Sequence, residues 1–129
     1  MALQLLDGET EIPVQDTDLD GVTDGDPEVS YVVRQIEPSV NRAAMKKHTK
    51  PGRNGRDAVV DFDAAYDDLI DHALIRWTGF LWRGAEAPCT RENKLLLDRP
   101  RKMALLLVAG LNRSQARAEE RAQSFPRPA

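Results

Sequence analysis

The chain has few of the residues on which secreted domains and small enzymes commonly depend. Its 129 residues include one cysteine, Cys89, and two histidines, His48 and His72. A single cysteine excludes an internal disulfide, so the sequence favours a domain that folds in a reducing compartment. No apolar run approaches the roughly 20 residues that a transmembrane helix needs, and no membrane span is expected.

A large excess of charge of one sign is also missing. The formal net charge is −3, from 18 Lys and Arg against 21 Asp and Glu, which disfavours a general nucleic-acid-binding protein. The distribution is uneven, because residues 1–30 contain no Lys or Arg. We interpret this acidic segment as solvated; pairing with a basic patch in the same or a neighbouring copy is the alternative.

No set of nucleophile, base and acid typical of catalysis is recognisable. Cys89 precedes a predicted helix N-terminus, where the pKa of a thiol can fall, but the sequence favours a small buried apolar role. His72 lies beside Asp68 and Asp71, which indicates a surface salt network more than a metal site. We therefore predict a protein that is not an enzyme.

Aromatic residues are scarce, at 5%, and they gather between residues 61 and 97. Apolar residues recur there at steps of three and four up to Trp77, which predicts one long amphipathic helix. Asp61 or Asp63 is the expected N-cap, and Gly79 is the expected end of the helix.

Beyond Gly79 the chain continues with Phe80, Trp82 and Arg83 into a turn. We predict that Trp77 belongs to the core and that Trp82 is the more exposed ring. Aromatic residues are favoured anchors at interfaces, so Phe80, Trp82 and Arg83 are the candidate partner-binding residues. The alternative is that the whole aromatic cluster forms the core of a domain poor in aromatics.

The other elements follow from local patterns. Residues 29–36 are the best strand, residues 11–14 are a weak edge strand containing Pro13, and residues 4–6 are another weak strand. Helices are expected from Pro38 to about His48, after Thr90, after Asp98 to Gly110 or Asn112, and after Ser114. Residues 125–129, Phe-Pro-Arg-Pro-Ala, are interpreted as a tail that is ordered only where a partner holds it.

These elements predict an α+β fold that is mostly α. A small N-terminal β-sheet or hairpin would precede a bundle of three to four short helices. The expected organisation is an acidic segment with weak strands over residues 1–28, one globular domain over residues 29–112, and a helix and tail over residues 113–129.

An aspartate-rich motif lies between Asp16 and Asp26, with carboxylates at alternate positions before Gly21. Such spacing can surround a hard cation, and the motif resembles the first half of an EF-hand loop. The resemblance implies Ca²⁺ and the metal ligands Asp16, Asp18, Asp20 and Asp24, with the carbonyl of Val22. The twelfth position is Pro27, where an EF-hand has a bidentate Glu, so an acidic loop without metal is the alternative.

Residues 67–93 resemble small tail assembly chaperones of long-tailed, Mu-like or siphovirus-type bacteriophages. The similarity lies in an acidic amphipathic helix that ends at Trp77-Thr78-Gly79, and in the block Pro88-Cys-Thr-Arg-Glu-Asn-Lys94. The strand over residues 29–36, the basic helix that follows it and the ending over residues 121–125 are also similar.

The resemblance implies a non-catalytic protein in the cytoplasm of a bacterial host, which binds the tape-measure protein and recruits tail-tube subunits. Self-association is possible, and no nucleic acid or membrane is expected as a partner. An amphipathic module with exposed apolar anchors can cover the apolar stripe of a partner helix. The alternatives are a structural tail or neck component of the virion, a calcium-stabilised adaptor, and a small enzyme.

Overall fold

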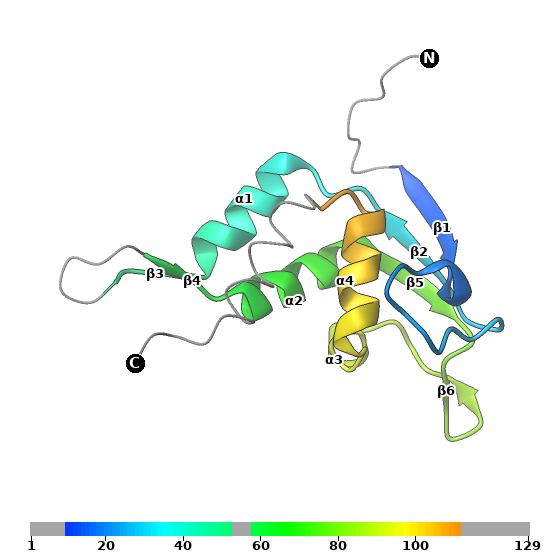
Figure 1. Ribbon diagram of the computed structural model, residues 1–129. Helices are drawn as coiled ribbons and strands as arrows, with labels where there is room; N and C mark the ends of the chain where they lie inside the picture. The colour runs from blue at the N-terminus through cyan, green and yellow to red at the C-terminus, as the bar shows by residue number, and fades with distance from the viewer. Residues whose placement is uncertain (1–9, 53–57, 112–129) are drawn as a thin grey trace, which may run out of the picture.

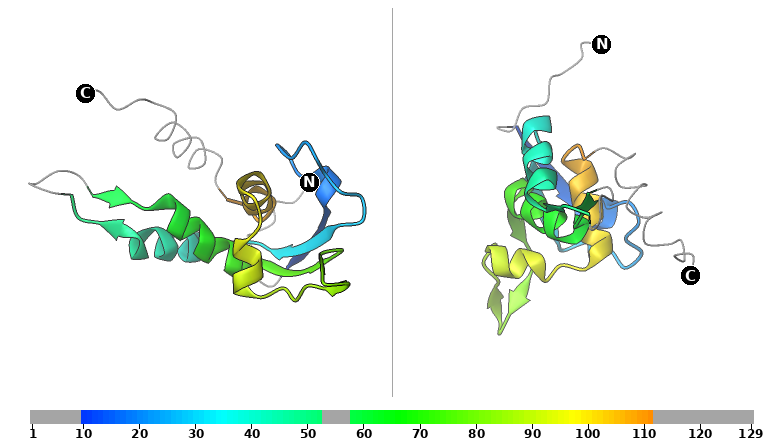
Figure 2. Two further views of the ribbon diagram at one scale, coloured as in Figure 1. Left: turned by 90° about the horizontal axis from the view of Figure 1, so that it is seen from below. Right: turned by 90° about the vertical axis from the view of Figure 1, so that its left-hand side faces the viewer.

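The computed structural model describes residues 10–52 and 58–111, and the structural statements that follow concern these residues. A three-stranded sheet lies at one end of the molecule, and a helical layer extends from it (Figures 1 and 2). The strands are β1 (Glu11–Gln15), β2 (Ser30–Arg34), β3 (Thr49–Lys50), β4 (Val59–Val60), β5 (Leu74–Thr78), β6 (Leu81–Trp82) and β7 (Ala85–Glu86). The helices are α1 (Pro38–Lys47), α2 (Phe62–Ala73), α3 (Arg91–Leu95) and α4 (Arg99–Val108), with a short 3-10 turn at Asp16–Asp18.

The main sheet has the order β1-β2-β5 and is antiparallel throughout. Tyr31 pairs with Val14 on one side and with Trp77 on the other, so the three side chains share the face toward the core. The opposite face carries Pro13 and Val32 among polar residues, and there Arg76 of β5 donates two hydrogen bonds to Glu11 of β1. β1 is an edge strand and contains Pro13, as the sequence predicted.

The core lies between this sheet, α2 and α4. Leu105 and Leu106 of α4 are fully buried, as are Ile70 of α2 and Val33 of β2. The amide of Ile36 donates to the carbonyl of Ala109 at 2.7 Å, which joins the chain after β2 to the end of α4. In Figure 1, α4 crosses the junction between α2 and β5.

Helix starts follow the predicted caps. Side-chain oxygens of Asp61, Thr90 and Asp98 accept hydrogen bonds from amides three residues later, at 3.2, 3.3 and 2.9 Å respectively. Pro38 occupies the first turn of α1. Local chemistry therefore determines where these helices begin.

The prediction of a mostly helical fold with a bundle of helices is wrong. Of the described residues, 41% are helical and 24% lie in strands, and the strands form three antiparallel sheets in a mixed α+β domain. The long helix predicted up to Trp77 ends at Ala73, and residues Leu74–Thr78 form strand β5.

The prediction was wrong because residues 74–78 have no local pattern that separates a strand from a helix, and pairing with β2 decides between them. Leu74 and Trp77 suit the helical period, but Ile75, Trp77 and Thr78 are also strong strand formers. β5 pairs with the free edge of β2 and satisfies backbone groups there, which a helix at this place would leave unpaired.

Residue 28, the predicted end of the acidic segment, lies in the loop between β1 and β2. The segment before it contributes β1, which pairs with β2, and the buried Asp16. The weak strand predicted over residues 4–6, the helix predicted after Ser114 and the tail over residues 125–129 lie outside the described residues. Among the described residues, no helix is long and apolar enough to cross a membrane.

Candidate partner-binding surface

A glycine turns the chain from β5 into a projecting hairpin. Gly79 has φ +97°, and a Cβ atom there would lie 2.3 Å from the carbonyl oxygen of Glu28. Only glycine fits this close approach and this backbone conformation. The predicted stop at Gly79 is therefore a turn after a strand, and the hairpin that follows stands beyond the end of the main sheet (Figure 1).

The hairpin consists of β6 and β7 joined by Arg83 and Gly84, which have φ values of 52° and 80°. Two central residues with positive φ are typical of the tight turn that matches the twist of antiparallel strands. The side chains of Trp82 and Ala85 face each other across the hairpin, and the Arg83 guanidinium lies 5.6 Å from the centre of the Trp82 ring.

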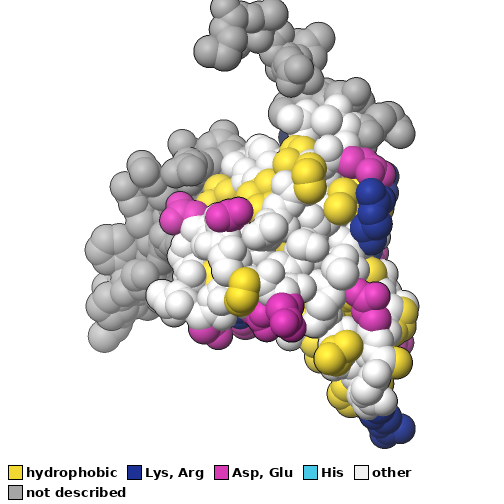
Figure 3. All heavy atoms as spheres, turned by 90° about the vertical axis from the view of Figure 1, so that its right-hand side faces the viewer, with side chains coloured by type: hydrophobic (Ala, Val, Ile, Leu, Met, Phe, Trp, Pro, Cys, Tyr) yellow, Lys and Arg dark blue, Asp and Glu magenta, His cyan; other side chains and the backbone are white. Residues whose placement is uncertain are grey.

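Trp77 and Trp82 differ sharply in exposure, as the sequence predicted. Trp77 is 8% exposed, and its Nε1 donates to the carbonyl of Ala87 at 2.8 Å. Trp82 is 66% exposed, and its neighbour Leu81 is 74% exposed. Apolar side chains gather on this projection in the space-filling view (Figure 3). Phe80 is partly buried, and its ring centre lies 4.5 Å from that of Trp77.

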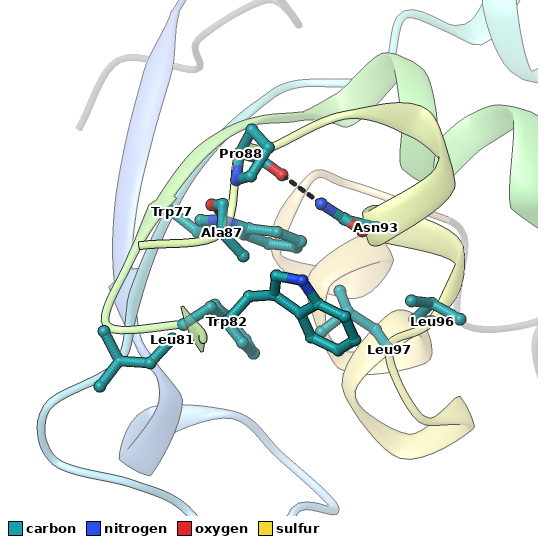
Figure 4. A pocket seen from close by; sticks show the side chains of 9 residues that line it. Trp77, Leu81, Trp82, Ala87, Pro88, Asn93, Leu96 and Leu97 are labelled. Carbon is teal, nitrogen blue, oxygen red and sulfur yellow. Dashed lines mark hydrogen bonds between the residues drawn. The ribbon is translucent and has the colours of Figure 1, made fainter. Parts of the chain in front are cut away.

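An apolar groove of about 570 Å³ lies between the hairpin and the segment that joins α3 to α4 (Figure 4). We call it the hairpin groove, and its lining residues are Trp77, Phe80, Leu81, Trp82, Ala87, Pro88, Asn93, Leu96 and Leu97. Leu97 is buried at its base, whereas Leu96 is 79% exposed at its rim. Of the three predicted partner-binding residues, Phe80 and Trp82 line the groove, and Arg83 lies at the hairpin tip.

Charged residues that the sequence did not single out hold α3, one wall of the groove, against α2. Lys94 is only 8% exposed, and its Nζ donates to the carbonyl of Asp71 at 2.9 Å. Arg91 donates to Asp68 at 2.8 Å and to Asp71 at 3.1 Å. No local pattern marks Lys94, because its partner lies 23 residues earlier in the chain.

The predicted salt network around His72 is centred elsewhere. His48, not His72, contacts Asp68 at 2.7 Å, and Arg76 pairs with Glu11. The hydrogen bond with His48, together with those from Arg91 and Lys47, holds the pKa of Asp68 well below its usual range. Burial and the nearby Arg34 lower the pKa of His72.

The cysteine does not have the surroundings of an activated thiol. Cys89 is half-buried and packs against the core, and burial raises the pKa of its thiol.

The aspartate-rich motif contributes one residue to the interior. Asp16 is 1% exposed; its Oδ1 accepts hydrogen bonds from Tyr31 at 2.6 Å and from Nε of Arg101 at 2.8 Å. Its Oδ2 accepts from Nη2 of Arg101 at 2.8 Å and from the amide of Asp26 at 2.9 Å. We call Asp16, Tyr31 and Arg101 the Asp16 lock. Burial opposes ionisation, but the hydrogen bonds from Arg101 and Tyr31 lower the pKa of Asp16 on balance.

The guanidinium of Arg101 therefore stands beside Asp16 where the calcium prediction places a cation. It also contacts Asp24, through the carbonyl at 3.1 Å and the carboxylate at 3.3 Å, while Asp18 and Asp20 are exposed. Within residues 10–52 and 58–111, no group of three or more His, Cys, Asp or Glu could hold a metal ion. Calcium binding at Asp16, Asp18, Asp20 and Asp24 stays a prediction, and it would require Arg101 to move.

Comparison of the chain with protein-family models, curated proteins and solved structures finds no match.

Proposed function

We propose that the protein is a non-catalytic binding module for phage tail assembly, in which the hairpin groove accepts the apolar side of a helix from the tape-measure protein. In this role it is a chaperone: it covers apolar stripes of the tape-measure chain and recruits tail-tube subunits to it. The groove and its rim are the binding site, with Trp82 as the central anchor.

One observation carries the proposal: Leu81, Trp82 and Leu96 are each at least 66% exposed around one apolar groove. Three large apolar side chains left in water at one place mark a surface that a partner covers. Tryptophan is also the residue type most enriched among those that dominate binding energy.

The form of the groove supports a helix as the ligand. Apolar side chains line it, and the amide of Asn93 is already engaged with the carbonyl of Pro88 at 2.9 Å. A partner helix satisfies its own backbone groups, so it can fill such a groove with side chains alone. The choice of the tape-measure protein rests on the resemblance of residues 67–93 to tail assembly chaperones.

Site-specific photo-crosslinking in phage-producing cells tests the proposal. A photoreactive phenylalanine analogue at position 82 is expected to crosslink to the tape-measure protein. The matched control is position 59, because Val59 is 63% exposed but belongs to the separate β3–β4 hairpin. Crosslinking from both positions, or from neither, contradicts the assignment of the groove.

Purified virions distinguish the chaperone from the alternative of a structural tail or neck component. A chaperone leaves the particle, so the protein is expected to be absent from virions. A fixed copy number per virion would assign the same groove to a permanent contact within the tail.

A further inference from the structure

One wall of the hairpin groove is a proline-containing stretch of the chain, which neighbouring side chains hold by its backbone carbonyls. Nε1 of Trp77 donates to the carbonyl of Ala87, and the side-chain amide of Asn93 donates to the carbonyl of Pro88 at 2.9 Å. Figure 4 shows Pro88 beside Trp77, at one end of the groove. Aromatic-lined grooves in which side chains donate to backbone carbonyls are the usual sites for extended proline-rich peptides.

The other half of the groove is open. Trp82 and Leu96 are 66% and 79% exposed, and the Trp82 ring lies across from Leu97 in Figure 4. The groove therefore has an unoccupied aromatic surface next to one that already packs against a proline.

The sequence contains one Pro-x-Pro segment, at Phe125-Pro126-Arg127-Pro128. Each proline fixes its own φ and biases the residue before it toward extended conformations. Such a segment loses little conformational entropy on binding, and Phe125 adds a large apolar side chain.

The segment is long enough to reach the groove within one chain. Residues 112–124 separate it from Leu111, the last described residue, which is buried at the end of α4. With residues 115–123 in the helix predicted after Ser114, at about 1.5 Å per residue, and the other four residues extended at about 3.3 Å each, this linker spans about 27 Å. That is about twice the radius of gyration of about 13 Å expected for a domain of this size.

Charge complementarity favours the same pairing. Glu92 is exposed in the first turn of α3, and it lies one helical turn before Leu96 at the groove rim. Residues four apart share one side of a helix, so Glu92 is placed to meet a cation above the groove. Arg127, between the two prolines, supplies that cation.

We infer that residues 125–128 occupy the open half of the hairpin groove of their own chain until a partner displaces them. The partner of the proposed function then competes with this segment, so the chain covers Trp82 when it is alone. The segment binds as an extended peptide, with its prolines and Phe125 against the Trp82 side and Arg127 toward Glu92.

Tryptophan fluorescence of the full chain tests the inference without any partner. The chain has two tryptophans, and Trp77 is buried, so changes in acrylamide quenching report on Trp82. The variant Phe125→Ala/Pro126→Ala/Pro128→Ala is expected to show a clear increase in quenching and a red-shifted emission. The matched control Gln115→Ala/Glu119→Ala/Gln123→Ala is expected to behave as wild type. In a Trp82→Phe background, the tail substitutions are expected to change nothing.

A synthetic peptide of residues 124–129 completes the test. Added to the tail variant, it is expected to restore protection of Trp82 saturably, and Glu92→Lys is expected to weaken this binding a few-fold. A peptide with both prolines replaced by alanine is expected to have no effect.

Equal quenching of wild type and tail variant, with no saturable response to the peptide, would overturn the inference. Protection that rises with protein concentration would also overturn it, by assigning the groove to the tail of a second copy. Neither result bears on crosslinking of position 82 to the tape-measure protein, so failure of this inference and failure of the proposed function are separately visible.

Discussion

The Asp16 lock buries charged side chains, whereas the hairpin groove exposes large apolar side chains to water. In the lock, a carboxylate and a guanidinium are withdrawn from water, and Asp16 is 1% exposed. In the groove, a tryptophan that is 66% exposed stands in water beside two exposed leucines. The sequence marks both stretches as possible sites, but in the structure their surroundings differ.

The two regions differ in whether the fold itself supplies contact partners for their side chains. Both oxygens of Asp16 accept two hydrogen bonds each within the fold, so the lock has no need of a ligand. The apolar surface around Trp82 has no such partner among the described residues, and only a ligand or another chain segment can remove it from water. The comparison teaches that the lock satisfies its own groups within the fold, whereas the groove leaves apolar surface exposed, which supports the proposal that a partner binds there.

The largest effect on stability is expected at the lock. Asp16→Ala leaves Arg101 and Tyr31 without their buried acceptor, and breaking a buried charge pair typically costs about 3–5 kcal/mol. Asp18→Ala, in the same motif but exposed, is expected to change the free energy of unfolding by less than about 0.5 kcal/mol. Urea denaturation of both variants makes the measurement. Equal effects would mean that Asp16 is not structural.

A comparable loss is expected at the buried ring next to the groove. Trp77→Ala removes a core side chain and its hydrogen bond to Ala87, at a typical cost of about 3–5 kcal/mol. Trp82→Ala is expected to cost less than about 1 kcal/mol, because its ring is mostly in water already. Thermal unfolding of the two variants measures the contrast. Equal destabilisation would place Trp82 in the core.

Acid is expected to reduce the stabilisation that the Asp16 lock gives to the fold. The pKa of Asp16 is lowered in the folded state, so the folded state binds its proton less readily than the unfolded state. The stabilisation from this carboxylate is therefore complete above the unfolded value of about 3.9 and is lost as pH falls below it.

The measurement is the melting temperature of wild type and Asp16→Asn from pH 7 to pH 2. The difference between them is expected to stay constant down to about pH 5 and to shrink below about pH 4. Asp68, whose pKa is also lowered, keeps part of the acid sensitivity in the variant. A difference that grows toward low pH would contradict the assignment.

A smaller effect is expected at the wall of the groove. Lys94→Met keeps the apolar stem of this buried residue but removes its bond to the carbonyl of Asp71, at an expected cost of about 1–3 kcal/mol. Lys46→Met, the same change at an exposed lysine of α1, is the control and is expected to be neutral in urea denaturation. If Lys94→Met is also neutral, α3 is held by Arg91 and apolar packing alone.

Local chemistry predicted several details of the structure, although not its fold class. The caps at Asp61, Thr90 and Asp98 and the edge position of Pro13 each depend on a few neighbouring residues, and all four are observed. The contrast between Trp77 and Trp82 was also predicted, although Trp77 owes its burial to a strand and not to a helix.

The features that the sequence analysis missed are those that distant partners decide. Strand β5 exists because β2 has an edge to complete, and Arg101 reaches Asp16 across 85 residues of sequence. Nothing near Asp16 distinguishes a carboxylate that binds a guanidinium from one that binds a metal ion. For the same reason Lys94, whose partner is also distant, was missed.

The most direct test of the hairpin groove as the binding surface is calorimetric titration of a tape-measure segment into wild type and Trp82→Ala. Trp82→Ala is expected to unfold as wild type does within about 1 kcal/mol, yet to lose at least about 2 kcal/mol of binding free energy. Unchanged affinity in a folded Trp82→Ala variant would contradict the account, and the groove would then not be the surface that binds the tape-measure protein.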